Sequence, residues 1–306
     1  MVETLIVPLD GSEVSERVLP LARQIVAEYQ AKVRLVSVVE APTEFSSWAA
    51  MPASVHAGEI EQWIDLRRSY LDDIASTFAG ADVAVKVDIG PPSVAILNEA
   101  DAAPQPMIVM ASHGRTGLGR LVLGSVTQRI IRRAACPVLV QPVHHGRQIE
   151  SARFERILAP LDGSEIGKRA LDAAREYFDL TPTELTLIQV IEAPDPSAPR
   201  IGGIAEPAVN YDVVLRYQES VRQDAESYLQ RVAEELRADG IRANWIVCDG
   251  HVATEVERVA REQDVQMIVL ATRGRGAIGR FLLGSVAERL LADMSRPIFL
   301  LGPSDE

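Results

Sequence analysis

Short apolar runs alternate with amphipathic segments along the first half of the chain. Runs typical of buried strands occur at 4–9, 33–39, 83–89, 107–111 and 137–140. Helices are expected after Ser12, where apolar positions recur at helical spacing, and at 59–79, 93–100 and 125–135. Strands that alternate with helices in this way predict a parallel α/β sheet.

The second half of the chain repeats the first. The segment LIVPLDGSE at 5–13 reappears as LAPLDGSE at 158–165, an offset of 152 residues. The segment MIVMASHGRTGLGRLVLGS at 107–125 matches MIVLATRGRGAIGRFLLGS at 267–285, an offset of 160. Two long matches in the same order indicate a duplicated domain.

This duplication defines the domain organisation and the fold class. We expect one domain at 1–143, a polar linker at 144–153 and a second domain at 154–306. Right-handed crossovers favour the strand order 3-2-1-4-5 in each domain. The predicted fold is therefore two tandem Rossmann-like, doubly wound, parallel five-stranded sheets related by a pseudo-twofold axis. In such sheets a ligand crevice lies at the carboxyl ends of strands one and four, where the winding reverses.

The fifth strand of each domain is expected at a sheet edge. Both are apolar, with PVLV at 137–140 and PIFLL at 297–301. An open apolar edge promotes unwanted pairing unless it is covered. We therefore predict that the two domains pair through these edges as a pseudo-dimer within one chain. Two chains can then associate further by symmetry into a homodimer.

One motif follows strand one in both domains. It comprises Pro8, Asp10 and Ser12 and, in the second copy, Pro160, Asp162 and Ser164. A carboxylate at the crevice can accept hydrogen bonds from a base amine or from ribose hydroxyls. Asp, Gly and Ser also serve a turn that caps a helix, and for these residues taken alone we favour that interpretation.

A second motif, rich in glycine, follows strand four. Ala111-Ser112-His113-Gly114, nine residues and Gly124-Ser125 recur as Ala271-Thr272-Arg273-Gly274, nine residues and Gly284-Ser285. Glycine allows a tight turn close to a ligand, and a helix N-terminus attracts phosphate. The arginines that follow, Arg115 and Arg275, are candidates for contacting phosphate oxygens. Because both copies keep the spacing, we favour a phosphate cradle over a flexible loop.

These motifs resemble those of the universal stress protein family. Its ATP-binding members carry G-x-x-G, nine residues and G-[S/T], and the resemblance covers essentially the whole chain twice. It implies a flavodoxin-like domain in which the strand-one Asp and the end of strand two hold adenosine, while the glycine-rich loop holds the phosphates. Carried over, the contacts are Asp10, the backbone at Val38, Gly114, Gly124, Ser125 and Val126, and then Asp162, Val190, Gly274, Gly284, Ser285 and Val286.

Two departures from the family pattern bear on the site. Ala111 and Ala271 stand where the pattern has its first Gly, which removes backbone freedom at positive φ. Ala287 stands where the first copy has Thr127, and this removes a hydroxyl that we expect on the phosphate side. The first copy therefore matches the family slightly better.

Composition narrows the function classes. The net charge of −12 disfavours a nucleic-acid polymer as partner. The two cysteines, Cys136 and Cys248, lie in different repeats and form no disulfide framework. The first residues lack the features of a signal peptide, and no uncharged apolar stretch reaches about 18 residues. We expect a cytoplasmic protein without a membrane partner.

Three functions fit these observations. The first is a stress-response sensor or signalling module that binds an adenine nucleotide, with ATP as cofactor, with or without Mg²⁺. The second is a slow ATPase or phosphoryl-transfer enzyme. No acid occurs in 112–124 or 272–284, which weighs against efficient turnover, and no residue is assigned a catalytic role. The third is an interaction protein that no longer needs nucleotide.

The segment GRGAIG at 274–279 follows strand four and is therefore not a dinucleotide fingerprint.

Overall fold

The structure, a computed structural model, describes residues 1–40, 53–112, 123–142, 154–192, 211–272, 283–293 and 296–302. The first copy contains β1 (Thr4–Pro8), α1 (Glu13–Glu16), α2 (Leu19–Tyr29), β2 (Lys32–Val39), α4 (Ala53–Ala75), β3 (Val83–Ile89), α5 (Pro92–Asp101), β4 (Pro106–Ala111), α6 (Ser125–Arg133) and β5 (Val138–Gln141). The second contains β6 (Arg156–Pro160), α7 (Glu165–Tyr177), β7 (Glu184–Ile191), α8 (Tyr211–Ala238), β8 (Arg242–Asp249), α9 (Val252–Glu262), β9 (Met267–Ala271), α10 (Ser285–Asp293) and β10 (Ile298–Leu301). The linker predicted at 144–153 lies outside the described residues.

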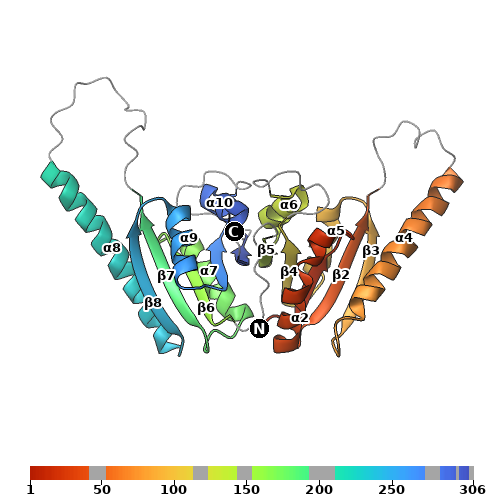
Figure 1. The fold of residues 1–306 in the computed structure, drawn as a ribbon, viewed down its shortest axis with the longest axis horizontal. Coiled ribbons are helices and arrows are strands. Elements are labelled where there is room, and N and C mark those ends of the chain that lie inside the picture. The colour runs from red at the N-terminus through yellow and green to blue at the C-terminus, as the bar shows by residue number, and fades with distance from the viewer. Residues whose placement is uncertain are drawn as a thin grey trace, which may run out of the picture.

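The described strands form one ten-stranded sheet in the order β3-β2-β1-β4-β5-β10-β9-β6-β7-β8. Each half is parallel and has the predicted order 3-2-1-4-5. The halves meet where β5 and β10 pair antiparallel, with Phe299 opposite Leu139. The predicted pairing of the two copies through strand five is therefore confirmed. Figure 1 shows this seam at the centre of the molecule, flanked by α6 and α10.

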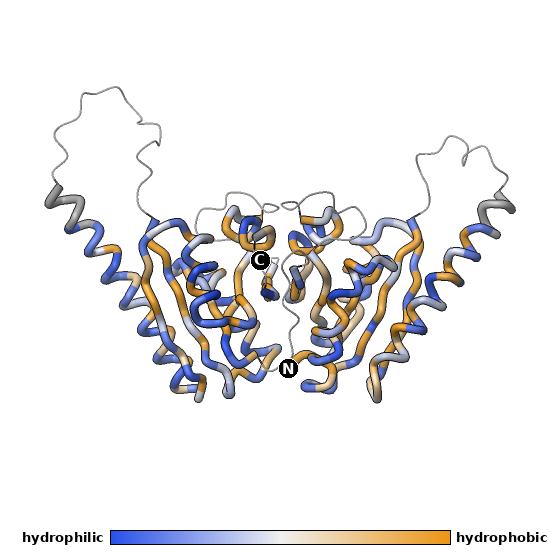
Figure 2. Tube along the Cα trace, in the orientation of Figure 1, coloured by the Kyte–Doolittle hydropathy of each residue, from blue (hydrophilic) through white to orange (hydrophobic). Residues whose placement is uncertain are grey.

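Two hydrophobic clusters fill the two faces of the sheet. The first cluster contains Leu5 of β1, Leu71 of α4 and Leu171 of α7, and α2 and α8 lie on the same face. The second cluster contains Ile6 of β1 and Leu290 of α10, with α5, α6 and α9. Figure 2 shows the hydrophobic residues concentrated along the strands, while α4 and α8 alternate between hydrophobic and hydrophilic positions. Because each cluster includes residues of both copies, the halves share their cores.

Aromatic side chains also join the halves below the seam. Phe178 is 1% exposed and packs edge-to-face on Tyr29 of the first copy, with ring centroids 5.7 Å apart. Phe154 and Phe299 pack on the same ring at 5.4 and 5.6 Å. The backbone N–H of Val2 donates to the carbonyl of Tyr177 across the same boundary, at 3.1 Å. The interface therefore extends beyond the paired strands.

The structure differs from the predicted elements at two helices. The segment after Ser12 forms α1 and then α2, because Pro20 at the start of α2 lacks an N–H and its ring disfavours a continuous helix. The second copy has no proline there, and α7 runs unbroken. The helix predicted at 59–79 lies at 53–75. It ends where the Ser76 hydroxyl donates to the Asp73 carbonyl at 2.6 Å, and the Thr77 hydroxyl donates to the chain in the same way.

Candidate functional site

The strand register brings the two motifs to the same edge of the sheet. In the first copy, β1 pairs Ile6 with Ile108 of β4 and Pro8 with Val36 of β2. Continued past the strand ends, this register sets Asp10 level with Val38 and Ser112. In the second copy, the pairs of Leu158 with Ile268 and Pro160 with Ile188 do the same for Asp162, Val190 and Thr272. Both halves therefore bring the two motifs together at the carboxyl ends of strands one and four.

The strand-one Asp shapes a turn that caps the next helix. Asp10 Oδ1 accepts hydrogen bonds from Ser12 N at 3.0 Å and Ser12 Oγ at 2.5 Å. Ser12 Oγ in turn accepts from Ser15 N, at 3.2 Å, and so caps α1. Asp162 and Ser164 make the same contacts, at 2.9 and 2.5 Å, and Ser164 caps α7. The turn-and-cap interpretation is confirmed in both copies, and ligand contact by these carboxylates stays a prediction.

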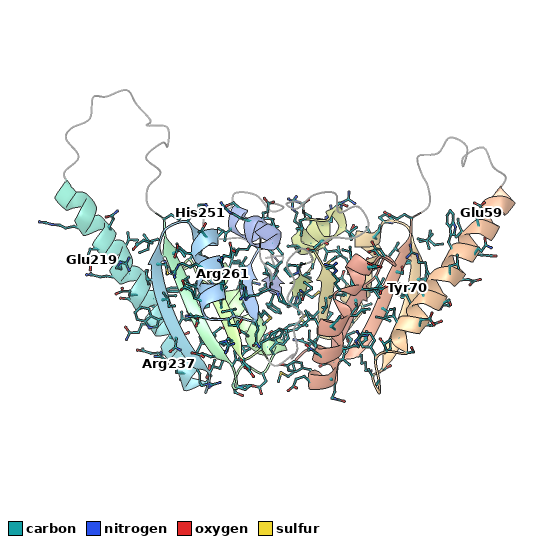
Figure 3. All side chains as sticks on the ribbon, viewed as in Figure 1. Glu59, Tyr70, Glu219, Arg237, His251 and Arg261 are labelled. Carbon is teal, nitrogen blue, oxygen red and sulfur yellow. The ribbon has the colours of Figure 1, made fainter. Side chains whose placement is uncertain are left out.

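A side chain that sequence reasoning missed supports this turn in the first copy. Arg67, on α4 and 57 residues away, donates from Nη1 to the Asp10 carbonyl at 2.5 Å. One turn further along α4, Tyr70 donates to Glu16 at 2.9 Å (Figure 3). Burial, followed by this hydrogen bond, raises the pKa of Tyr70 above its usual range. Two side chains of α4 thereby attach this helix to the Asp10 turn and to α1.

The second copy lacks the arginine. Leu71 and Phe78 of the first copy are buried, as are Leu229 and Leu236 at the same spacing. Aligning these pairs places Ala225 opposite Arg67, and Ala225 is only 2% exposed. No sequence signal near the motifs could have revealed Arg67, because the contact depends on how α4 packs on the sheet.

The end of strand four is tied directly to the helix that follows it. Gly124 N donates to the Ser112 carbonyl at 2.9 Å, and Gly284 N donates to the Thr272 carbonyl at the same distance. These two amides close the glycine-rich loop. Gly124 is the N-cap residue of α6 and provides no side-chain cap, so the first amides of this helix, from Ser125 on, receive no hydrogen bond from a capping side chain. An uncapped helix start of this kind attracts anions.

Thr127 has a hydrogen-bond partner in the protein that the sequence did not indicate. The residue is 3% exposed, and its hydroxyl donates to the Ala111 carbonyl at 3.1 Å. It anchors α6 to β4, and a contact between this hydroxyl and a phosphate stays a prediction. Ala287 fills the matching position with 2% exposure, so this difference between the copies changes the packing of the helix on the strand.

The alanines that replace the first family glycine cause no strain. Ala111 and Ala271 are buried at the ends of β4 and β9. Among the described residues, the non-glycine positions with positive φ are Gln30, Gln105 and Asp264. The backbone freedom that we expected to matter at these alanines is therefore not needed.

Apolar side chains lie near the two motifs in each copy. Val38 and Val126 are partly buried against the second cluster in the first copy, as are Val190 and Val286 in the second. Pro8 and Pro160 are half-buried at the ends of β1 and β6. Partly buried apolar side chains of this kind are typical of sites that accept the flat, largely apolar face of a base.

A comparison of the sequence with models of protein families identifies the family of this chain. The model of the Universal stress protein family matches residues 1–142 and again residues 153–301. The chain belongs to the universal stress protein family. A universal stress protein of Mycobacterium tuberculosis is 27% identical over 307 residues, covering 97% of this chain and 96% of that protein. Another, from Methanocaldococcus jannaschii, is 31% identical over 142 residues, covering 44% of this chain and 79% of that protein. The crystal structure of an Archaeoglobus fulgidus universal stress protein has a TM-score of 0.67 at 20% identity, covering 99% of this chain and 97% of that one.

Several predicted contacts of this universal stress protein lie outside the described residues. They are Gly114, Arg115, Gly274 and Arg275. In the described part of the chain, no three His, Cys, Asp or Glu side chains gather as a group able to hold a metal ion. No described helix is long and apolar enough to span a membrane.

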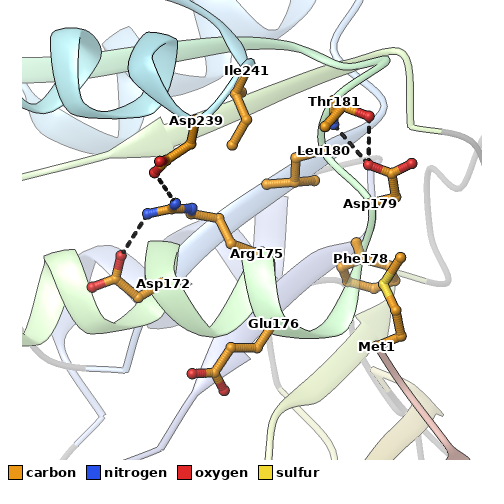
Figure 4. Close-up of a pocket in the computed structure, with 10 residues that line it drawn as sticks. All are labelled: Met1, Asp172, Arg175, Glu176, Phe178, Asp179, Leu180, Thr181, Asp239 and Ile241. Carbon is orange, nitrogen blue, oxygen red and sulfur yellow. Dashed lines mark hydrogen bonds and ion pairs between the residues drawn. The ribbon is translucent and has the colours of Figure 1, made fainter.

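The described universal stress protein fold also has a depression of about 650 Å³ away from the motifs (Figure 4). It lies beside the end of α7 and is lined by residues including Arg175, Leu180 and Ile241. The Arg175 guanidinium pairs with Asp172 at 3.4 Å and with Asp239. The central cation of this depression is thus already neutralised by two carboxylates.

Proposed function

We propose that this universal stress protein binds an adenine nucleotide at the carboxyl edge of each half and acts as a nucleotide-dependent sensor or regulator. The observation that supports the proposal most directly is the uncapped start of α6 beside the Asp10 turn. A side chain that capped this helix would compete with phosphate for the same amides. Gly124 leaves them open, and Gly284 repeats the arrangement next to Asp162.

The surrounding groups suit the other parts of a nucleotide. Val38 and Val126 offer an apolar wall for the base. The Asp10 carboxylate is held in place by the two hydrogen bonds from Ser12 and lies at the level where a ribose would lie between base and phosphate. A rigid acceptor loses little entropy on binding. A local ring of amides can bind phosphate even though the chain carries a net charge of −12.

The first test is calorimetric titration of the purified protein, freed of any co-purified nucleotide. Adenosine, AMP, ADP, ATP and cyclic AMP are compared, the last three with and without Mg²⁺. We expect up to two sites per chain and an affinity that rises from adenosine to ATP. Absence of binding at millimolar ATP contradicts the proposal. Phosphate release measured in the same samples decides whether binding is accompanied by turnover.

Phosphate binding at the N-termini of α6 and α10 is tested with Ser125→Glu and Ser285→Glu. A carboxylate about 6 Å from one phosphate charge, at an effective dielectric constant of about 40, costs about 1.4 kcal/mol, or about tenfold in affinity. An acid in the first turn of a helix is favourable to folding, so stability is retained. Ser125→Gln and Ser285→Gln are the matched neutral controls.

We expect the Glu variants to lose ATP affinity at least about tenfold while adenosine binds unchanged. Unchanged ATP affinity in a folded Ser125→Glu, Ser285→Glu protein would place the phosphates elsewhere.

A cytoplasmic location and a further homodimer are part of the same proposal. Cell fractionation tests the location, and sedimentation at several protein concentrations tests the homodimer.

A further inference from the structure

Thr272 carries a buried hydroxyl for which the described part of the chain offers no hydrogen-bond partner. The residue is only 3% exposed. A buried hydroxyl without a partner costs about 1–3 kcal/mol, so such a group in a native protein requires an explanation. The position of Thr272 in the fold provides one.

The backbone of Thr272 is fixed by two hydrogen bonds at the carboxyl end of β9. Its N–H donates to the Leu301 carbonyl at 3.1 Å, and its carbonyl accepts from Gly284 N at 2.9 Å. Along β9, Leu270 belongs to the second cluster and Ala271 to the first. Since side chains alternate along a strand, Thr272 follows on the face of the second cluster, where α10 lies. The hydroxyl is therefore held at the junction between the strand end and the start of α10.

The two copies distribute hydroxyls differently around this junction. In the first copy, the hydroxyl on the helix, from Thr127, is paired with the Ala111 carbonyl. Ser112, which matches Thr272, has an interaction partner as well. In the second copy, the helix position holds Ala287, and the hydroxyl of Thr272 lacks a protein partner among the described residues. Among the residues that the structure describes, the second copy thus has a buried hydroxyl without a protein partner beside the start of α10.

We propose that the Thr272 hydroxyl contacts the ligand of the second site, donating to a phosphate oxygen of the nucleotide bound at the start of α10. The inference rests on the function proposed above and adds a residue that the family motif does not include. Burial removes competing water, so a single hydroxyl donor contributes more there than at the surface. The second site then depends on this hydroxyl in a way that the first site does not.

The experiment compares four folded variants of the full chain. Thr272→Val removes the hydroxyl at nearly constant volume, and Thr272→Ser restores it. Thr4→Val removes another buried hydroxyl that lacks a described partner, at the start of β1 and thus at the opposite edge of the sheet. Thr127→Val removes a hydroxyl that is paired. Stability is measured by urea unfolding without nucleotide, and binding by calorimetry with ATP and with adenosine.

The expected pattern separates a ligand contact from a structural role. Thr272→Val and Thr4→Val remain as stable as the unmodified chain or gain stability, whereas Thr127→Val loses it because the Ala111 carbonyl is left buried and unpaired. Thr272→Val weakens ATP binding at the second site about five- to tenfold, and Thr4→Val does not. Adenosine binds all four variants equally, and Thr272→Ser binds ATP as the unmodified chain does. Photolabelling with 8-azido-ATP and peptide mapping assigns the lost site to the second half.

Three results overturn the inference, and they are distinguishable. If the unmodified chain binds no nucleotide, the proposed function fails and this contact with it. If the chain fills two sites and Thr272→Val fills both with unchanged affinity, the function stands and the contact is wrong. If Thr272→Val is destabilised as much as Thr127→Val, the hydroxyl is paired within the protein and serves the fold.

Discussion

Replacing Phe178 by alanine is expected to destabilise both halves of the chain, although Phe178 belongs to the second. Its ring is 1% exposed and packs edge-to-face on Tyr29, Phe154 and Phe299. Of these partners, Tyr29 is the last residue of α2 in the first copy. Loss of the ring therefore opens a cavity at the boundary between the copies.

The magnitude follows from the packing. Truncation of a buried Phe to Ala costs about 3–5 kcal/mol, which includes the edge-to-face contacts at about 0.5–1.5 kcal/mol each. A domain is typically stable by about 5–15 kcal/mol, so this loss is a large fraction of the total. Because both hydrophobic clusters run through the two copies, the loss should be shared by the whole molecule.

Tryptophan fluorescence can follow the halves separately. Trp63 lies on α4 in the first copy and Trp245 on β8 in the second. Variants that keep only one of them, with the other tryptophans replaced by phenylalanine, are unfolded in urea with and without Phe178→Ala. We expect the two probes to report one coincident transition, shifted to lower urea by the same amount. Leu66→Ala, which truncates a side chain that is 66% exposed, serves as the control and should change stability by no more than about 0.5 kcal/mol.

An unchanged midpoint for Trp63 in the Phe178→Ala protein refutes the reasoning. That result would mean that the first copy unfolds as an independent domain and that the continuous clusters do not couple the halves. Separate transitions for the two probes in the unmodified chain would lead to the same conclusion.

Two further predictions concern single side chains. Arg67→Met keeps the apolar stem of the side chain but removes the hydrogen bond to the Asp10 carbonyl. The affinity for ATP should therefore fall about three- to tenfold at the first site only. Equal losses of affinity at both sites in a calorimetric titration would contradict this prediction. Burial raises the pKa of the Cys136 thiol from 9.0 to about 11. The stability that the neutral thiol contributes is complete below pH 9 and is lost as the pH rises through 11. The advantage of the unmodified chain over Cys136→Ala in urea should therefore shrink between about pH 9 and about pH 11, and a constant difference across this range would argue against a shifted thiol.

The order of the strands was predictable because it follows from local patterns and from handedness. Apolar runs mark the strands, right-handed crossovers fix their order, and the apolar edges at 137–140 and 297–301 indicate the seam. The break between α1 and α2 had a visible signal in Pro20, but the helical spacing of apolar positions on both sides of it suggested a single helix.

The site was less predictable, because a hydrogen-bond partner depends on distances set by the fold. The Asp10 turn could be anticipated, since Ser12 lies only two residues away. The hydrogen bond of Thr127 could not be anticipated, because its partner is the carbonyl of Ala111, 16 residues earlier. Arg67 gave no local signal at all, since it reaches the turn from a helix 57 residues away.

The antiparallel pairing of β5 with β10 makes the joining of two units a folding step and not an encounter between molecules. Dilution cannot separate the units, whereas a chain with one copy and the same apolar edge would have to find a second chain at a rate set by its concentration. The two units also need not remain identical, since a change in one is not imposed on the other. Arg67 opposite Ala225 and Thr127 opposite Ala287 show such divergence. Duplication thus gives one polypeptide the asymmetry of a heterodimer without any requirement for partner choice.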